Sequence, residues 1–194
     1  MEENGLIARS QAGDIEAFNQ LVEQYQRLVY NLALRMLSNA ELAEDVSQDT
    51  FLSAFKAMGK FRGGNFKSWI LRIAANSCRD RMRAARRARI RSLDDLLEES
   101  GDFIADDSSE SPEEYALRQE LGRLLKKGVA DLPGDQRLVI VLCDIMGLSY
   151  EEISQITGSS LGTVKSRLNR GRARLRIFLV QRKELLPPQF RQDK

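Results

Sequence analysis

Residues 149–176 read SYEEISQITGSSLGTVKSRLNRGRARLR. Ser149 followed by Glu152 matches a capping box, in which the two side chains bond to otherwise unpaired amides at the start of a helix. Gly158 stands where that helix must end, because glycine readily adopts a left-handed conformation. Ser159 is a favourable N-cap for a further helix. The stretch therefore predicts two short helices around a tight turn.

The second of these helices is strongly basic. Residues 161–183 carry eight Lys or Arg side chains and no Asp or Glu. Such a helix neutralises phosphates, and its N-terminal half can enter the major groove of DNA. A solvated cationic helix, or one lying on an anionic membrane, is the alternative. The turn, the cap and the charge together favour a helix-turn-helix that binds duplex DNA. Its predicted buried stripe is Leu161, Val164, Leu168, Leu175 and Phe178.

Charge alternates in blocks along the 194 residues, although the formal net charge is only +2. Residues 62–91 carry ten basic side chains against one acidic, and residues 94–120 carry eleven acidic against one basic. The acidic block is rich in Ser and lacks apolar periodicity, so residues 92–111 are predicted to be a flexible linker. Two basic surfaces are therefore expected, one on each side of an acidic connection.

Apolar residues recur at helical spacing in nearly every other segment. Amphipathic helices are predicted over residues 18–36, 39–60 and 67–89, followed by one that starts at Pro112 and is broken at 132–134. An apolar helix over 138–146, capped by Asp135, then leads into the helix-turn-helix. No segment shows the period of two that is typical of strands. The expected fold class is all-α, with two small helical domains at 5–91 and 112–183 and a loose tail at 184–194.

The composition argues against an enzyme and against a membrane protein. The chain contains no His, and Cys78 and Cys143 lie far apart within apolar helical patterns, as expected of reduced, buried thiols. No metal site, cofactor or catalytic residue is therefore expected. The N-terminus is too polar for a signal peptide, and no apolar run approaches the ~20 residues of a membrane span. A cytoplasmic location without membrane insertion follows.

Aromatic residues are interleaved with cations in the first basic block. Exposed rings beside Lys and Arg suit unstacked single-stranded bases, because the rings stack and the cations follow the backbone. Trp69 shares a helical face with Ile73, which favours a core position. Phe61 and Phe66 flank a Gly-Gly loop and fit either the core or a stacking surface. A polar set at helical spacing forms one edge that either meets DNA or is simply solvated: Asn76, Arg79, Asp80 and Arg83.

Four segments, in this order, carry a family resemblance. They are AFNQLVEQYQRLVYNLA at 17–33, AEDVSQDTFLSAFKAMGKFRGG at 43–64, FKSWILRIAANSCRDRMR at 66–83, and LPGDQRLVIVLCDIMGLSYEEISQITGSSLGTVKSRLNRGRARLR at 132–176. With the acidic linker between them, they resemble a bacterial RNA polymerase sigma factor of the extracytoplasmic-function (ECF) group of the sigma-70 family. The resemblance covers nearly the whole chain.

The resemblance implies an alternative sigma factor, a subunit without catalysis of its own. Such a subunit binds core RNA polymerase, directs it to promoters through the −35 and −10 elements, and helps to open the DNA. An anti-sigma factor is an implied partner. Residues 45–51 match the segment that binds the polymerase, and an excess of acidic residues over 13–58 fits a basic partner surface, with a solvated acidic face as the alternative. The expected contacts are Asp45, Gln48, Asp49 and Phe51.

The two DNA-reading regions follow from the same resemblance. The loop and helix after Lys60 match the part that recognises and melts the −10 element, with candidates Phe61, Arg62, Asn65, Phe66 and Lys67 near the loop and Asn76, Arg79, Asp80 and Arg83 on the helix. The helix-turn-helix matches the reader of the −35 element. Lys165, Ser166, Asn169 and Arg170 are expected at base edges, and Arg167, Arg172 and Arg174 at phosphates. Arg can pair with guanine and Asn with adenine, each worth about 1–3 kcal/mol of discrimination.

A stand-alone helix-turn-helix regulator is the competing hypothesis. The N-terminal half gives it no support, because neither a phosphoacceptor receiver domain nor a ligand pocket is visible there. Ser160 stands where members of the resembled family often carry Pro, which leaves the helix start sound but changes its entry angle.

Overall fold

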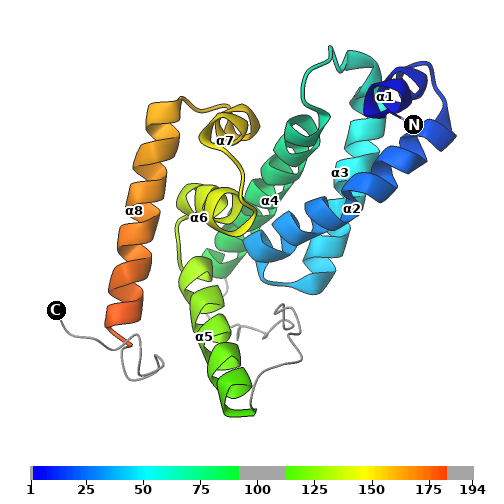
Figure 1. Cartoon of the computed structure of the whole chain (residues 1–194). Coiled ribbons are helices and arrows are strands. Elements are labelled where there is room, and N and C mark those ends of the chain that lie inside the picture. Colours follow the sequence, from blue (N-terminus) through cyan, green and yellow to red (C-terminus); the bar gives the residue numbers. More distant parts are fainter. Residues whose placement is uncertain (1, 92–111, 183–194) are drawn as a thin grey trace.

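The computed structural model describes residues 2–91 and 112–182, and within these ranges it is built of helices and short connections, with no strand. The N-terminal half holds α1 (Glu3–Gln11), α2 (Ile15–Leu37), α3 (Ala40–Ala57), the 3₁₀ turn η1 (Met58–Lys60) and α4 (Phe66–Arg91). The C-terminal half holds α5 (Pro112–Ala130), α6 (Gly134–Ile140), the π-helical turn η2 (Val141–Ile145), α7 (Tyr150–Thr157) and α8 (Leu161–Val180) (Figure 1). The all-α fold class is confirmed. The predicted linker at 92–111 and the tail at 184–194 lie outside the described residues.

The N-terminal half packs α2, α3 and α4 side by side, with α1 across one end (Figure 1). Both long helices before α4 begin at a side-chain cap: Asp14 accepts from the amide of Ala17 at 3.1 Å, and Asn39 accepts from the amide of Leu42 at 2.8 Å. Fully buried side chains line the inner faces of these helices, as the periodicity predicted: Leu21, Val29, Leu32, Met36, Val46 and Ile70.

Helix α1 is the element that the sequence pattern does not predict. Only Leu6 and Ile7 provide a clear apolar face, and both are buried. Gln11, the last residue of α1, donates from its side-chain amide to the carbonyl of Phe61 at 2.5 Å. Packing on α2 and this contact with a distant loop hold α1 in place, and short helices depend on such tertiary contacts more than on local propensity.

The helix-turn-helix forms much as its sequence indicates. Ser149 accepts from the amide of Glu152 at 3.2 Å, and the Glu152 carboxylate accepts from the amide of Ser149 at 2.9 Å, so the capping box is confirmed. Gly158 has φ 63°, a left-handed conformation that favours glycine. Val164 and Leu168 are buried as predicted, whereas Leu161 is 39% exposed, so the prediction that it is buried is wrong.

Two predicted caps are wrong. Ser160, not Ser159, caps α8 by accepting from the amide of Thr163 at 3.2 Å. Pro133, not Asp135, is the N-cap of α6, which therefore starts one residue before Asp135. In both cases the displaced side chain has an arginine partner instead, so tertiary contacts decide its role.

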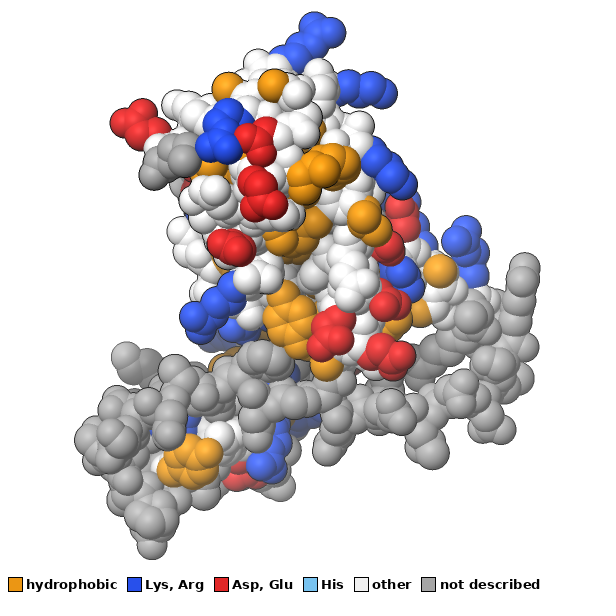
Figure 2. Space-filling view, turned by 90° about the vertical axis from the view of Figure 1, so that its right-hand side faces the viewer, with side chains coloured by type: hydrophobic (Ala, Val, Ile, Leu, Met, Phe, Trp, Pro, Cys, Tyr) orange, Lys and Arg blue, Asp and Glu red, His pale blue; other side chains and the backbone are white. Residues whose placement is uncertain are grey.

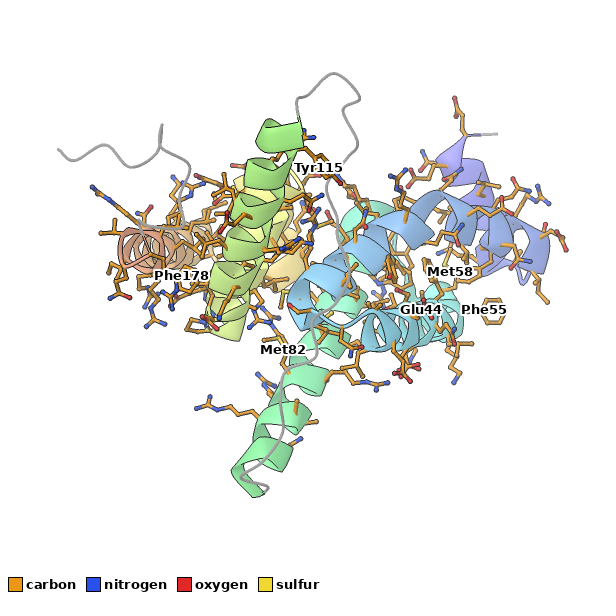
Figure 3. All side chains as sticks on the ribbon, turned by 90° about the horizontal axis from the view of Figure 1, so that it is seen from below. Glu44, Phe55, Met58, Met82, Tyr115 and Phe178 are labelled. Carbon is orange, nitrogen blue, oxygen red and sulfur yellow. The ribbon has the colours of Figure 1, made fainter. Side chains whose placement is uncertain are left out.

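The two halves pack against each other. Helix α7 lies against α4, and α6 contacts both α2 and α4 (Figure 1). The buried apolar side chains form one cluster through both halves, with Ile70 on one side and Ile153 and Ile156 on the other. Met82 projects from α4 toward the C-terminal half (Figure 3), where its Cε lies 3.4 Å from the position of a Cβ on Gly134. The sequence patterns gave no indication of this contact.

Candidate nucleic-acid interface

The exposed face of α8 gathers the side chains that were predicted to read base edges. Lys165, Ser166, Asn169 and Arg170 are all exposed and lie on one side of the helix. Val164, Leu168 and Gly171 are buried on the opposite side. Helix α8 stands at the outer edge of the molecule (Figure 1). Cationic and amide donors therefore face solvent together at the N-terminal half of a helix whose other side is fixed to the core.

Two of the three predicted phosphate contacts have partners within the protein. Arg172 binds both carboxylate oxygens of Asp144, with Nε–Oδ2 at 3.0 Å and Nη2–Oδ1 at 2.5 Å, and these bonds raise the pKa of Arg172. Arg167 donates to Ser159 Oγ at 3.0 Å and to Asp135 at 3.2 Å. Both guanidinium groups thus orient α8 on its neighbours. The third candidate, Arg174, is exposed.

The aromatic candidates of the N-terminal half are core residues. Phe61 is 7% exposed and Phe66 is 1% exposed, so of the two alternatives, a core position and a stacking surface, both rings take the core position. The rings cluster with Tyr25 and Trp69: Phe66 lies 5.4 Å from Tyr25, and Phe61 lies 5.0 Å from Trp69, measured between centroids. The Tyr25 hydroxyl donates to the Glu3 carboxylate at 3.0 Å. Burial, followed by this hydrogen bond, raises the pKa of Tyr25 to about 12. The spacing of aromatic residues in the sequence could not distinguish a core role from a base-stacking role for rings beside this loop.

The polar candidates of the same loop remain at the surface. Arg62 and Asn65 are exposed. Gly63 and Gly64 between them have φ of 86° and 94°, so this tight turn favours glycine at both positions. Asn65 accepts from the amide of Ser68 at 2.9 Å, which fixes the first turn of α4. The loop therefore holds its exposed side chains on a rigid base of buried rings.

The predicted polar edge of α4 is divided between solvent and the C-terminal half. Asn76, Asp80 and Arg83 are exposed. Arg79 is 17% exposed, its Nε lies 3.4 Å from Asp135, and burial lowers its pKa. Lys67 Nζ lies 3.1 Å from the Glu152 carboxylate.

Arg72, which is not among the predicted site residues, donates from Nε to the carbonyl of Gln155 at 2.9 Å. Lys67, Arg72 and Arg79 thus lie on the side of α4 that contacts α7 and the start of α6.

A second exposed face, on α3, combines acidic and apolar side chains. Asp45, Gln48 and Asp49 are exposed, whereas Phe51 is half-buried and packs on the core. Arg81 lies 3.0 Å from Asp49 and 3.6 Å from Asp45, so it offsets part of their charge. Figure 2 shows acidic and apolar side chains together on this side of the molecule.

Two further residues of this face are not among the contacts predicted from the sequence. Leu52 is 58% exposed and Phe55 is 42% exposed, and Phe55 points outward from α3 (Figure 3). They follow Gln48 at steps of four and seven along the helix, a spacing that places all three on one side. Extending the helical period from Gln48 would have found them.

No metal site is evident in the described ranges, where no three potential ligands among Cys, Asp and Glu come together. Likewise, no helix within residues 2–91 and 112–182 is both long and apolar enough to cross a membrane.

Both halves match known protein families. Residues 21–88 match the family described as Sigma-70 region 2, and residues 122–175 match the family described as Sigma-70, region 4. The chain is 38% identical to the ECF RNA polymerase sigma factor SigE of Mycolicibacterium smegmatis over 183 residues, which cover 93% of this chain and 69% of the relative. It is 36% identical to the RNA polymerase sigma-H factor of Pseudomonas aeruginosa over 176 residues, 88% of this chain and 90% of the relative.

Two solved structures share the fold. The sigma factor RpoE of Bartonella quintana, in complex with the anti-sigma factor NepR, superposes with a TM-score of 0.66 at 31% identity and covers 84% of this chain and 96% of its own. CnrH, in complex with the cytosolic domain of CnrY, superposes with a TM-score of 0.65 at 27% identity and covers 90% of this chain and 94% of its own.

Proposed function

This chain belongs to the RNA polymerase sigma factors of the sigma-70 family, in the ECF group, and we propose that three of its surfaces divide the work of promoter selection. As a sigma factor it binds core RNA polymerase and directs it to promoters for the initiation of transcription. It performs no catalysis of its own and acts in the cytoplasm. The observation that carries the proposal is the exposed polar face of α8, held on a capped helix-turn-helix.

The face of α8 reads the −35 element in the major groove. Lys165, Ser166, Asn169 and Arg170 supply donors to base edges, and Arg174 contacts a phosphate. Arg167 and Arg172 are paired with carboxylates of the C-terminal half. Their main role is therefore to fix the orientation of α8, and their charge toward DNA is secondary.

The loop before α4 and the exposed edge of α4 contact the −10 element. Arg62 and Asn65 are exposed beside the two left-handed glycines of the loop, and Asn76, Asp80 and Arg83 form the solvent edge of the helix. Lys67 and Arg79 belong to the same basic surface. Phe61 and Phe66 support this surface indirectly, because their buried rings pack against each other and fix the conformation of the loop.

The exposed face of α3 binds the core polymerase. Asp45, Gln48 and Asp49 provide polar contacts, and Leu52 and Phe55 add apolar area at the same side. Exposed apolar side chains rimmed by charge are typical of protein interfaces.

An anti-sigma factor is a further proposed partner. The solved relatives at TM-scores of 0.66 and 0.65 are complexes with the anti-sigma factor NepR and with the cytosolic domain of CnrY. We expect a protein that co-purifies with this chain from uninduced cells and prevents its pull-down by core polymerase. Unhindered binding of core by the complex would contradict this assignment.

Run-off transcription with purified core polymerase tests the function directly. We expect a specific transcript only when the chain is added, and weak binding of promoter duplex by the chain alone. A stand-alone regulator would behave in the opposite way. Tight, site-specific binding of duplex at physiological salt, without a transcript, would therefore support the regulator instead.

The polymerase-binding face has its own test. Asp49→Lys should abolish pull-down of core polymerase, because it reverses charge at the centre of the face and repels the Arg81 side chain that lies 3.0 Å away. Far-UV circular dichroism should stay unchanged, since Asp49 is exposed. Glu23→Lys makes the same charge change at an exposed site on α2 and should leave pull-down intact. Equal binding by both variants would remove Asp49 from the interface.

A further inference from the structure

Leu161, the first residue of α8, is an exposed apolar side chain to which the proposed function gives no role. It is 39% exposed, although its helical spacing predicted a buried position. We propose that Leu161 selects for thymine in the −35 element by packing against the 5-methyl group of that base in the major groove. The proposal rests on the proposed reading of the −35 element by α8 and adds a specificity-determining residue to it.

Leu161 begins the exposed stripe that carries the proposed base contacts. Exposed residues along this half of α8 come in pairs that repeat every four positions: Leu161 and Gly162, Lys165 and Ser166, Asn169 and Arg170. Val164 and Leu168, between these pairs, are buried. Positions four apart lie on one side of a helix, so Leu161 stands one turn before Lys165 on the same face. Leu161 therefore extends the DNA-facing surface by one turn.

The first turn of α8 is fixed in its backbone and open beside Leu161. Ser160 accepts from the amide of Thr163 at 3.2 Å, and the two hydroxyl oxygens lie 2.9 Å apart. Gly162 has no side chain. Outside its chain neighbours and helix backbone, a Cβ there would meet only Ser160 Oγ, at 3.9 Å, among the described residues. A base edge can therefore approach this turn closely, next to a leucine whose backbone is held by the cap.

The chemistry of the stripe lacks a reader of thymine without Leu161. Lys and Arg pair with guanine, Asn pairs with adenine, and Ser bonds to several bases. These are the side chains at 165, 166, 169 and 170. Thymine alone presents a methyl group in the major groove, and an apolar side chain recognises it by contact. Leu161 is the apolar side chain of this stripe, so it supplies the missing contact.

Helix geometry limits which base pair is involved. Four residues of an α-helix advance about 6 Å, and successive base pairs are about 3.4 Å apart. The thymine should therefore lie about one or two base pairs from the pair that Lys165 contacts. Ile177 of α8 is also exposed, at 57%. It lies about 24 Å further along the helix, so it cannot reach the same base.

A base analogue that lacks only the methyl group tests the contact. Preferred −35 elements are selected from a randomised promoter library with holoenzyme made from the wild-type chain and core polymerase. Each thymine of the selected duplex, on either strand, is then replaced singly by deoxyuridine, and promoter binding is measured by competition. We expect one replacement to weaken wild-type binding about two- to fourfold, as expected for a methyl group that leaves an apolar contact.

Three variants assign this penalty to Leu161. Leu161→Ala shortens the side chain, so it should weaken the thymine promoter about two- to fourfold, and deoxyuridine should cause no further loss. Leu161→Met keeps the apolar reach and should keep the penalty. Ile177→Ala removes an exposed apolar side chain from the other end of α8 and should also keep it. Far-UV circular dichroism should be unchanged in both Leu161 variants, because the side chain is exposed.

The outcomes distinguish the role of Leu161 from the function of α8. A selected −35 preference in which no deoxyuridine penalty depends on Leu161 overturns the proposal and leaves the reading of the −35 element standing. Loss of the penalty in Ile177→Ala as well as in Leu161→Ala assigns it to the helix as a whole and also overturns the proposal. A wild-type holoenzyme that selects no −35 sequence removes the reading function, and the role of Leu161 with it.

Discussion

At the scale of the residue, arginines of one basic helix have different tasks. Arg170 lies along the exposed face of α8, with Nε donating to the carbonyl of Ser166 at 3.2 Å. Arg172, two positions on, is bound to Asp144 through both of its carboxylate oxygens. Since a bidentate pair is geometrically specific, Arg172 fixes the helix, whereas Arg170 is available to bases. Neighbours from other elements, not residue type, separate these roles.

Arg170→Ala should weaken promoters according to their upstream sequence. The loss should reach about 1–3 kcal/mol where the −35 element offers the preferred base and should be small elsewhere. Run-off transcription on a set of −35 variants measures this pattern. Arg176→Ala removes an exposed cation from the same helix and should reduce all promoters alike. A uniform loss for Arg170→Ala would assign that side chain to a phosphate.

The acid response of the chain should depend in part on Glu152. The backbone amide of Ser149, followed by Lys67, holds the pKa of Glu152 below its ordinary value of 4.5. The unfolded chain therefore takes up this proton at a higher pH than the folded chain. The stabilisation is complete above about pH 4.5 and is lost as the pH falls through the lower, folded-state pKa.

Urea midpoints measured from neutral pH into the acid range test this response. Glu152→Gln keeps a side chain that can cap α7 but removes the titration, so its midpoints should fall less steeply below pH 4.5 than those of the wild type. A residual slope should remain, because the pKa of Asp14 is also lowered by the backbone of Ala17. Identical slopes in both proteins would show that Glu152 does not contribute.

At the scale of the element, the close crossing of α6 and α8 positions the DNA-facing helix. Gly171 is buried at this crossing, and a Cβ there would lie 2.9 Å from Cγ1 of Ile140. The π-helical turn η2 then follows α6 with Val141 and Leu142 buried, and Asp144 within it reaches Arg172. Two features of backbone shape, a glycine and a wide turn, thus hold α8 at one angle.

Gly171→Ala should destabilise the fold by about 1–3 kcal/mol, because the added methyl overpacks the crossing. Helix propensity alone would favour alanine by about 1 kcal/mol, so the sign of the effect tests the packing. Gly162→Ala in the first turn of the same helix meets only Ser160 Oγ at 3.9 Å and should be neutral or stabilising. Urea denaturation measures both, and a stabilising Gly171→Ala would contradict the close approach.

At the scale of the whole molecule, Arg137 connects the two halves. Its guanidinium donates to the carbonyl of Met36, at the end of α2, at 2.5 Å and to the carbonyl of Ala130, at the end of α5. Helix C-termini carry partial negative charge, so a cation between two of them stabilises both. Burial lowers the pKa of Arg137. The contact therefore joins α6 of the C-terminal half to the end of α2 in the N-terminal half.

Arg137→Met should uncouple the two halves. It leaves two helix-terminal carbonyls without their donor, at a cost of about 1–3 kcal/mol. Trp69, the single tryptophan, reports on the N-terminal half, and far-UV circular dichroism reports on all helices. The two urea transitions should coincide in the wild type and separate in the variant. Coincident transitions in both would contradict the coupling, and Arg123→Met, at an exposed site on α5, is the control.

Much of the fold could be predicted from patterns among residues close together in the sequence. Helical periodicity located α2, α3, α4, α5 and α8, and the Ser149–Glu152 spacing located the start of α7. The polar face of α8 followed from the same period. Asp135 and Phe66 have partners far away in the sequence, because Asp135 pairs with Arg79 and Phe66 packs on Tyr25. Local pattern does not report such partners.

The sequence by itself determined the all-α class, the helix-turn-helix and the block pattern of charge, because period, caps and charge are properties of neighbouring residues. Only the tertiary structure decided which of those charges are available to DNA. Lys67, Arg79, Arg167 and Arg172 are cations in any reading of the chain, yet each is paired with a carboxylate of the C-terminal half. Pairing depends on how helices pack through space, and the packing of α7 and α6 against α4 brings Glu152 and Asp135 to the basic surface.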